Sequence, residues 1–551
     1  MSDNRHTIGR WTADRARLSP DAVAIEERGH ATTYARLDTR ATALAERLVR
    51  AGYGRGDRVA TLTRNSTDHV VLFFACAKAG LVLVPLSWRL STDELGYQLR
   101  HARPALVLVQ ATLADSARAA LAGLDPAPAV ELLGADGVEQ HVPYPVRTDP
   151  APPGPQRPVA DDDPLLIVYT SGTASAPKGA ILTHANCFWT NLSLSGAIGL
   201  TEHDVVLAVL PQFHVGGWNI QPLLAWWTGA TVVLEPEFDA GRALAAIAAH
   251  GVTTTMGVPT IYRLLAEHPT FADADLSSLT HAVVGGATMP PALLRTWHDR
   301  GVRVTQGYGL TEAGPNVLAL PASDAAAHLG SVGKPYPHVE VTVTDPATGQ
   351  VLPGSGRGEL LVRGPNVFAG YFRDPEATAE TLRDGWLHTG DLVERDAEGF
   401  FRVVDRIKDI YISGGENIAP AEVEAALTAH PEVLEAAVVG VLDQRWGEVG
   451  HAYVVRAAGS RLTSEQVIAH TRTLLAAFKA PRTVDFVDQL PRTALHKVRR
   501  GALPRPAPTA GRAGEPPAGQ PGAGHPVVGR PATGQPAAAL RLVSGDEGAA
   551  R

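Results

Sequence analysis

The chain has 551 residues, of which 45% are hydrophobic and 19% are charged, and this composition is typical of a soluble globular protein with several domains. The 49 basic and 57 acidic residues give a net charge of −8, which offers no electrostatic footprint for binding nucleic acid. The two cysteines exclude a disulfide framework, no apolar run is long enough to span a bilayer, and the N-terminus lacks a signal-peptide core, so a cytoplasmic protein is expected.

The first part of the chain alternates between strand and helix patterns. A helix is predicted over residues 33–51, because Leu37, Leu44 and Leu48 recur on one helical face. Further apolar runs predict strands over 59–62, 81–86, 165–168, 205–210, 231–234, 253–256 and 282–284, with helices over 69–79 and 243–250. This alternation favours parallel sheets covered by helices.

The pattern changes after Gly330. Short alternating runs at 339–343 and 358–362 predict an antiparallel or barrel-like part. Residues 409–500 carry the signals of a small α+β domain of their own. Residues 506–551 are rich in Pro, Gly and Ala, and we expect a disordered tail because so few large apolar side chains cannot offset the entropy of ordering.

One stretch, Tyr169–Ala180, carries the strongest chemical signal, because hydroxyl residues, glycines and one lysine follow a predicted buried strand. It reads Y-T-S-G-T-A-S-A-P-K-G-A. Glycine lets the backbone approach an anion closely, and a lysine adds a point charge, so the stretch predicts a triphosphate-binding loop. The spacing differs from a Walker A motif. An ordinary surface loop is the alternative interpretation.

Several segments in a fixed order resemble the adenylate-forming superfamily of acyl-CoA synthetases, peptide-synthetase adenylation domains and luciferases. Besides Thr170–Gly179, they are Gln306–Glu312, Gly385–Asp391, Asp405–Asp409, Ser413–Asn417 and Pro491–Lys497. The resemblance covers about residues 10–500. It departs from the usual pattern at Ser175 and His496, where the family usually has glycine.

The resemblance implies a two-step reaction. A carboxylate attacks the α-phosphate of ATP to give acyl-AMP and pyrophosphate, with Mg²⁺, and the acyl group then passes to a thiol, most simply that of coenzyme A. It also implies a large N-terminal domain of helix-covered sheets with a small barrel-like part (residues 1–407) and a smaller, mobile α+β domain (408–500), within an α/β fold. Lys408 matches the hinge between them. Gly414 and Gly415 match a loop that lines the CoA tunnel, although a simple turn is the alternative interpretation.

The resemblance assigns further residues to ATP. Those matching the β- and γ-phosphate loop are Thr170, Ser171, Gly172, Thr173 and Lys178. Thr311 matches a residue at the α-phosphate, and Glu312 a magnesium ligand, since a hard cation suits a carboxylate. Tyr308 matches the aromatic that stacks on adenine, and Gly286 with Ala287 the segment beside the base. Asp391 matches the carboxylate that binds the ribose, and Arg406 a contact to ribose or phosphate. For Glu312 and Asp391 the alternatives are a solvated acid and a turn aspartate.

The remaining assignments concern the acid and catalysis. His214 matches a histidine at the mouth of the acyl pocket, to which Trp218 and Gly309 are also assigned; a satisfied structural histidine and a core tryptophan are the alternatives. Lys497 matches the lysine that bridges carboxylate and α-phosphate, where a cation stabilises charge in the transition state. An exposed lysine near a basic chain end is its alternative.

We therefore predict an AMP-forming acid–CoA ligase with ATP, Mg²⁺, CoA and a small carboxylic acid as ligands. Adenylation with a carrier protein or an amine as acceptor is the alternative within the same fold. A non-catalytic binding protein is the rival from another class, against which the presence of Lys178, Glu312, Asp391 and Lys497 argues. The sequence does not identify the acid, and it leaves a homodimer open.

Overall fold

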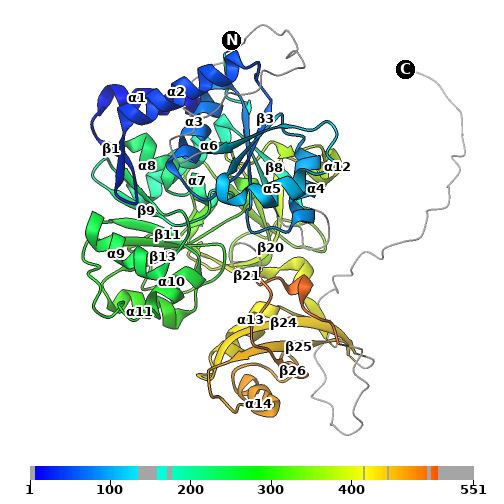
Figure 1. Ribbon diagram of the computed structural model, residues 1–551. Coiled ribbons are helices and arrows are strands. Elements are labelled where there is room, and N and C mark those ends of the chain that lie inside the picture. The colour runs from blue at the N-terminus through cyan, green and yellow to red at the C-terminus, as the bar shows by residue number, and fades with distance from the viewer. Residues whose placement is uncertain are drawn as a thin grey trace, which may run out of the picture.

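A computed structural model describes residues 6–133, 158–170, 177–413, 416–443, 446–492 and 498–506. The tail expected to be disordered lies outside these ranges from residue 507 onward. Figure 1 shows a large upper body that holds two sheets and most helices, and a smaller body at the end of the described chain. In the described ranges, no helix is both long and apolar enough to cross a membrane.

The first large sheet has nine strands and is parallel through most of its width. In spatial order they are β15 (Lys334–Pro335), β14 (Asn316–Ala319), β13 (Arg303–Gly309), β12 (His281–Val284), β11 (Thr254–Gly257), β9 (Val205–Ala208), β10 (Thr231–Leu234), β1 (Val23–Glu27) and β2 (His30–Thr33). Helices α9 (Ala240–His250), α10 (Pro259–Ala266) and α11 (Pro291–Asp299) pack on one side (Figure 1). The parallel arrangement confirms the prediction from the strand and helix alternation.

The second large sheet has seven strands. Their order is β18 (Gly370–Tyr371), β8 (Lys178–Thr183), β7 (Pro164–Thr170), β4 (Val82–Leu86), β3 (Arg58–Leu62), β5 (Leu106–Gln110) and β6 (Ala129–Leu133). Strands β7 to β6 are parallel neighbours, whereas β8 runs antiparallel to both β7 and β18. Helices α4 (Thr92–Ala102) and α5 (Ala114–Leu121) pack on this sheet.

A shared core joins the two large sheets. It contains side chains of both sheets and of the helices between them, such as Ile25 of β1, Leu83 of β4, Phe74 and Trp226. The helices around this core are α1 (Trp11–Leu18), α2 (Tyr34–Arg50), α3 (Thr67–Ala79), α6 (His184–Ile198), α7 (Gly216–Asn219) and α8 (Pro222–Thr228). Because apolar side chains interlock across both sheets, the two sheets form one body.

Side-chain caps explain where predicted helices begin earlier than expected. The helix expected from residue 69 begins at Thr67, because the Ser66 hydroxyl accepts the backbone N–H of His69. The helix expected from residue 243 begins at Ala240, because the Asp239 carboxylate accepts the backbone N–H of Arg242. Apolar periodicity locates the middle of a helix, whereas the cap fixes its first residue.

The region after Gly330 forms a five-stranded antiparallel sheet, as its short alternating runs predict. The strands are β16 (Glu340–Thr344), β17 (Gly356–Arg363), β20 (Trp386–Arg395) and β19 (Leu382–Arg383) in this order, with β21 (Phe401–Arg406) on β20. Helix α12 (Pro375–Thr381) precedes β19. The pairing order of these described strands is open rather than a closed ring.

The last described part of the chain has its own sheet and its own core. Strands β23 (Glu416–Ile418), β22 (Tyr411–Ser413), β25 (Gly447–Arg456) and β24 (Val433–Asp443) form this sheet, and β26 (Thr483–Phe486) pairs parallel to β25. Helices α13 (Pro420–Thr428) and α14 (Ser464–Leu474) pack together. This α+β arrangement is the one predicted for residues 409–500.

Two buried histidines predict a loss of stability in acid. Burial lowers the pKa of His69 from 6.5 to about 3 and that of His184 to about 4. The Nδ1 of His184 accepts the backbone N–H of Ile8 at 3.1 Å, which requires an unprotonated nitrogen there. Both rings are thus neutral in the folded state, whereas histidines of the unfolded chain take up protons near pH 6.5. The free energy of unfolding should fall as the pH drops below about 6.5, by about 1.4 kcal/mol per pH unit for each ring.

Urea unfolding at neutral and mildly acidic pH measures this effect. The variant His184→Gln keeps an acceptor for the Ile8 amide and should show a weaker pH dependence than the parent chain. His203, whose side chain is 88% exposed, provides the matched control His203→Gln, which should behave like the parent. An unchanged pH dependence of His184→Gln would contradict the prediction.

Candidate active site

A cleft of about 2490 Å³ lies where the two large sheets meet the five-stranded sheet and the C-terminal part. Parallel strands β7 and β13 both end at it, with Thr170 and Gly309 as their last residues. Ligands of α/β proteins commonly bind at the carboxyl ends of parallel strands. The predicted site residues that line the cleft are Thr170, Lys178, His214, Gly286, Ala287, Tyr308, Gly309, Thr311, Glu312, Asp391, Arg406 and Lys408.

Two neighbouring strands bring Thr170 and Lys178 together. Thr170 ends β7 and lies opposite Lys178, the first residue of β8, in their antiparallel register. The sequence placed Lys178 in a loop; instead it begins a strand, which gives its side chain a fixed direction. Its Nζ lies 5.1 Å from the centre of the Tyr371 ring. The predicted phosphate-loop residues Ser171, Gly172 and Thr173, and the unusual Ser175, lie outside the described residues.

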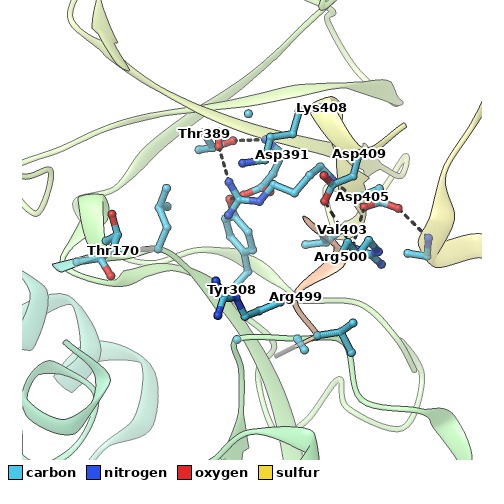
Figure 2. A pocket seen from close by; sticks show the side chains of 18 of the residues that line it. Thr170, Tyr308, Thr389, Asp391, Val403, Asp405, Lys408, Asp409, Arg499 and Arg500 are labelled. Carbon is cyan, nitrogen blue, oxygen red and sulfur yellow. Dashed lines mark hydrogen bonds and ion pairs between the residues drawn. The ribbon is translucent and has the colours of Figure 1, made fainter. Parts of the chain in front are cut away.

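Tyr308, Asp391 and Arg406 form one hydrogen-bonded group (Figure 2). The Tyr308 hydroxyl donates to Asp391 Oδ2 at 2.5 Å, and Arg406 Nε lies 2.6 Å from Asp391 Oδ1. Asp391 of β20 faces Arg406 of β21 in register, so two adjacent strands set this pair. Thr389 supports both, since its hydroxyl accepts the Asp391 N–H and its carbonyl accepts from Arg406 Nη1.

Electrostatics keep this group in a definite charge state. Burial and the Asp391 carboxylate raise the pKa of Tyr308, so the phenol keeps its proton. Burial alone would lower the pKa of Arg406, but the Asp391 charge, together with those of Glu312 and Asp409, outweighs it and the net shift is upward. A neutral phenol and a guanidinium thus flank one buried carboxylate, whose remaining acceptor capacity suits hydroxyl groups of a ligand.

Glu312 is held by a residue that the sequence analysis missed. Thr311 and Glu312 begin the short helix η4 (Thr311–Ala313), directly after β13 and Leu310. The Tyr371 hydroxyl donates to Glu312 Oε1 at 2.7 Å. Burial, followed by the Glu312 charge, raises the pKa of Tyr371, so this phenol remains a donor. Tyr371 belongs to none of the motifs recognised in the sequence. The pairing of β18 with β8 places it beside Glu312.

The carboxylate of Glu312 fits a magnesium ion bound together with phosphate. Among the described residues, no group of three or more His, Cys, Asp or Glu side chains is arranged to hold a metal by protein ligands alone. Mg²⁺ commonly takes one or two carboxylates and completes its shell with substrate phosphates and water. A single carboxylate within a nucleotide cleft is consistent with that mode of binding.

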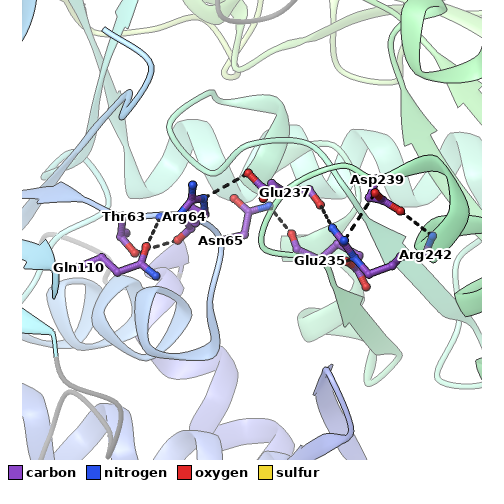
Figure 3. A network of polar contacts seen from close by, with 8 residues as sticks. All are labelled: Thr63, Arg64, Asn65, Gln110, Glu235, Glu237, Asp239 and Arg242. Atoms are coloured by element: carbon purple, nitrogen blue, oxygen red, sulfur yellow. Dashed lines mark hydrogen bonds and ion pairs between the residues drawn. The ribbon is translucent and has the colours of Figure 1, made fainter. Parts of the chain in front are cut away.

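A polar network joins the two large sheets at the carboxyl ends of β3 and β10 (Figure 3). Arg64 Nε lies 3.2 Å from Glu237 Oε2, and Asn65 Nδ2 donates to the Glu235 carbonyl at 3.1 Å. Arg242 Nε lies 3.1 Å from Glu235 Oε2. The first two contacts connect residues about 170 positions apart in the chain. They hold the ends of these two strands together across the junction of the large sheets.

Comparison with known proteins shows the family of this chain. The family model "AMP-binding enzyme" covers residues 12–372, and "AMP-binding enzyme C-terminal domain" covers residues 422–497. The chain belongs to the AMP-binding enzyme family. A feruloyl-CoA synthase from Amycolatopsis sp is 43% identical over 90% of this chain and 98% of its own length. An indoleacetate–CoA ligase from Aromatoleum aromaticum is 39% identical over 90% of this chain and 96% of its own length.

Solved structures of this family superpose over most of the chain. The o-succinylbenzoate CoA synthetase of Bacillus subtilis, in complex with its acyl-adenylate intermediate, gives a TM-score of 0.79 at 31% identity, covering 91% of this chain and 98% of that one. The same enzyme with ATP and magnesium ion gives 0.78 at 32% identity, covering 90% and 99%. The adenylate-forming family expected from the motifs is therefore confirmed.

One pocket assignment in this AMP-binding enzyme is wrong. Trp218 was assigned to the acyl pocket, but its side chain is fully buried and is not among the described residues that line the cleft. It stacks on Phe73 with ring centres 4.6 Å apart, and its Nε1 donates to the Gln212 carbonyl at 2.6 Å. Trp218 is therefore a core residue, which was the alternative interpretation.

Gly309 also has a structural reason to be glycine. A Cβ at this position would lie 1.6 Å from the Pro315 carbonyl oxygen, so no side chain fits. Gly309 still lines the cleft, as do His214, Gly286 and Ala287. His214 and these three small residues thus all line the cleft, and packing alone is a sufficient reason for the glycine at 309.

The remaining predicted residues lie at the C-terminal side of the cleft or outside the described chain. Lys408 is in the short helix η5 (Ile407–Asp409), and burial, followed by the Arg406 charge, lowers its pKa. Gly414, Gly415, His496 and Lys497 lie outside the described residues. Arg492 and Val498, which flank the segment that carries Lys497, both line the cleft.

Proposed function

We propose that this AMP-binding enzyme activates a carboxylic acid with ATP and transfers the acyl group to coenzyme A. The observation that carries the proposal is the convergence of Lys178, Glu312 and the Tyr308–Asp391–Arg406 group in one cleft. Phosphoryl chemistry requires mainly positioning and neutralisation of charge, and these residues supply both. Relatives named as CoA synthases and ligases, and one solved with an acyl-adenylate, support the same reaction.

In the first step, an oxygen of the acid attacks the α-phosphorus of ATP, and the bond to pyrophosphate breaks. Tyr308 offers its ring to the adenine, and Asp391 accepts the ribose hydroxyls while Arg406 keeps that carboxylate charged and oriented. Thr170 and Lys178, with Ser171, Gly172 and Thr173, hold the β- and γ-phosphates, and Thr311 contacts the α-phosphate. Lys497 stabilises the charge that develops between carboxylate and α-phosphate.

Magnesium, held by Glu312, would neutralise phosphate charge when ATP is bound. Tyr371 orients this carboxylate through its hydrogen bond, so Tyr371 is a positioning residue for the metal site. In the second step, the thiol sulfur of CoA attacks the acyl carbonyl, AMP departs, and the thiol proton passes to solvent. Gly414 and Gly415 line the path of the pantetheine arm.

The acid is proposed to carry an aromatic ring. The relatives named above act on feruloyl, indoleacetate and o-succinylbenzoate groups, which all contain one. In this chain, the cleft is lined by His214 and by apolar side chains that include Phe213, Val258 and Leu310. Such walls suit an aromatic ring, whose burial is favourable and non-directional.

Pyrophosphate release with a panel of aryl and aliphatic acids tests the first step. Mass spectrometry of the products with and without CoA tests the second. The proposal predicts pyrophosphate with an aryl acid and an acyl-CoA mass only when CoA is present. Accumulation of acyl-AMP that an added amine consumes, without thioester, would favour the alternative acceptor. No pyrophosphate with any acid would favour a binding protein.

The domain division, with residues 1–407 and 408–500 on either side of a hinge at Lys408, belongs to this proposal. The two free cysteines, both buried, support a cytoplasmic location, because a reducing compartment needs no disulfides. Whether two copies of the chain associate stays a prediction, which sedimentation would measure.

Replacing Lys408 with proline is expected to reduce thioester formation more than adenylation. Proline fixes φ, and a hinge residue must change its backbone angles when one domain rotates on the other. The two half-reactions are measured separately, as pyrophosphate release without CoA and as acyl-CoA formation from supplied acyl-AMP. Equal losses in both would place the hinge elsewhere.

A further inference from the structure

Helix α13 follows Lys408 in the chain, but the side chain that caps its first turn comes from a residue that precedes Lys408. Its own N-cap residue, Ala419, has no side chain that can accept a hydrogen bond. The Asp405 carboxylate supplies one instead, since Asp405 Oδ2 accepts the backbone N–H of Ala421 at 2.7 Å. The first turn of a helix presents unpaired N–H groups, and a carboxylate is a favoured partner. Asp405 is the penultimate residue of β21, so this contact joins the two sides of Lys408.

The same carboxylate is buried and needs a counter-charge. The Asp405 side chain is 3% exposed, and burial raises its pKa. Arg500 provides the positive charge, with its Nη1 3.8 Å from Asp405 Oδ1 and 3.5 Å from Asp409 Oδ2. Figure 2 shows Arg500 beside both aspartates. Arg500 thus pairs with one carboxylate before Lys408 and one after it.

Arg500 is anchored most firmly to α13 itself. Its Nε and Nη2 donate to the two carboxylate oxygens of Glu424 at 3.0 and 2.6 Å, a fork that fixes the guanidinium plane. Glu424 Oε1 also accepts the Val438 N–H at 2.8 Å. Among the described residues, the carboxylates around Arg500 are those of Asp405, Asp409 and Glu424, and only Asp405 precedes Lys408. Rotation about Lys408 would therefore break the Asp405 contacts and leave the Glu424 and Asp409 contacts in place.

We propose that Arg500 is a positioning residue for adenylation and that, with Asp405, it forms a clasp across Lys408. The clasp holds the C-terminal part so that Val498 and Arg499, next to Arg500 in the chain, line the same cleft as Lys178 and Tyr308. The inference rests on the proposed function, because it assigns this arrangement to the first half-reaction. Thioester formation, for which the hinge is proposed to rotate, does not need the clasp.

The test compares Arg500→Gln and Asp405→Asn with the parent in both half-reactions, using the full chain. Arg505, exposed near the end of the described chain, gives the matched control Arg505→Gln. A hydrogen bond or ion pair that involves a charged group contributes enough free energy to change the ratio of two conformations by about tenfold or more. Both clasp variants should therefore lower kcat for pyrophosphate release by about tenfold. Their KM for ATP, and acyl-CoA formation from supplied acyl-AMP, should stay within about twofold of the parent.

Hydrogen exchange adds a readout that does not depend on activity. In both variants the amide of Ala421 should exchange faster than in the parent, while Arg505→Gln should leave it unchanged. If Arg500→Gln does not fold, Arg500→Lys keeps the charge but loses the fork, and it should give a smaller effect in the same direction. Equal losses in both half-reactions, or an unchanged first half-reaction with faster Ala421 exchange, would overturn the proposal. A parent chain that releases no pyrophosphate would reject the proposed function instead, and the exchange data would still test the clasp.

Discussion

Replacing Lys497 with alanine is expected to lower the rate of acyl-AMP formation by about 10²–10³ while the chain still folds. The reason is differential binding, since a cation that bridges the attacking carboxylate and the α-phosphate acts on charge that is largest in the transition state. The described residues on either side of this segment, Arg492 and Val498, line the same cleft as Lys178 and Tyr308. Pyrophosphate release in the absence of CoA measures the step directly.

Lys479→Ala is the matched control for this prediction. Lys479 belongs to the same part of the chain, but its Nζ pairs with Glu422 and it does not line the cleft. Loss of a partly exposed ion pair costs about 1 kcal/mol or less, so the control should fold and keep its rate. Because the proposed role of Lys497 is confined to the first step, acyl-CoA formation from supplied acyl-AMP should change little. Equal pyrophosphate release by Lys497→Ala and the parent would disprove the catalytic assignment.

The fold was predictable where one short segment contains its own signal. The apolar repeat of Leu37, Leu44 and Leu48 identified α2, which runs from Tyr34 to Arg50, within one residue of the predicted bounds at each end. The strands of the parallel sheets were predictable for the same reason, since a run of buried apolar residues needs no distant partner to be visible. Lys178 shows the limit of prediction from sequence. A lysine that begins a strand and a lysine that ends a loop cannot be distinguished until the neighbouring strand is known.

The site was predictable where family motifs carry it and hidden where contacts cross the fold. Tyr308, Asp391 and Arg406 came from three separate motifs, and the structure joins them by hydrogen bond and ion pair. The sequence assigned no role to Tyr371 or Arg500, because their hydrogen-bond and ion-pair partners lie 59 to 95 positions away in the chain. Trp218 was assigned to the acyl pocket because it stands beside a motif in the sequence. An aromatic side chain near a site can face either the ligand or the core, and the sequence does not show which.

The second large effect is expected from Asp391. Replacing it with alanine should lower kcat/KM for ATP by about 10²–10³, mainly through KM. A hydrogen bond to a charged group contributes about 1.5–3 kcal/mol, and the ribose is proposed to make more than one such bond with this carboxylate. The variant also removes the counter-charge 2.6 Å from Arg406 Nε, so the guanidinium loses its orientation. Steady-state pyrophosphate release at varied ATP measures both constants.

Tyr308→Phe separates the two roles of this group. It removes the hydroxyl that donates to Asp391 at 2.5 Å but keeps the ring that is proposed to stack on adenine. Because one oxygen of Asp391 then gains acceptor capacity for the ribose, we expect KM for ATP to change by less than about threefold. Tyr308→Ala removes the ring as well and should raise KM much further, since stacking of a base on an aromatic ring is worth about 1–3 kcal/mol. If Tyr308→Phe were as damaging as Tyr308→Ala, the hydroxyl rather than the ring would carry the function. If Asp391→Ala left KM for ATP unchanged, the ribose would bind elsewhere in the cleft.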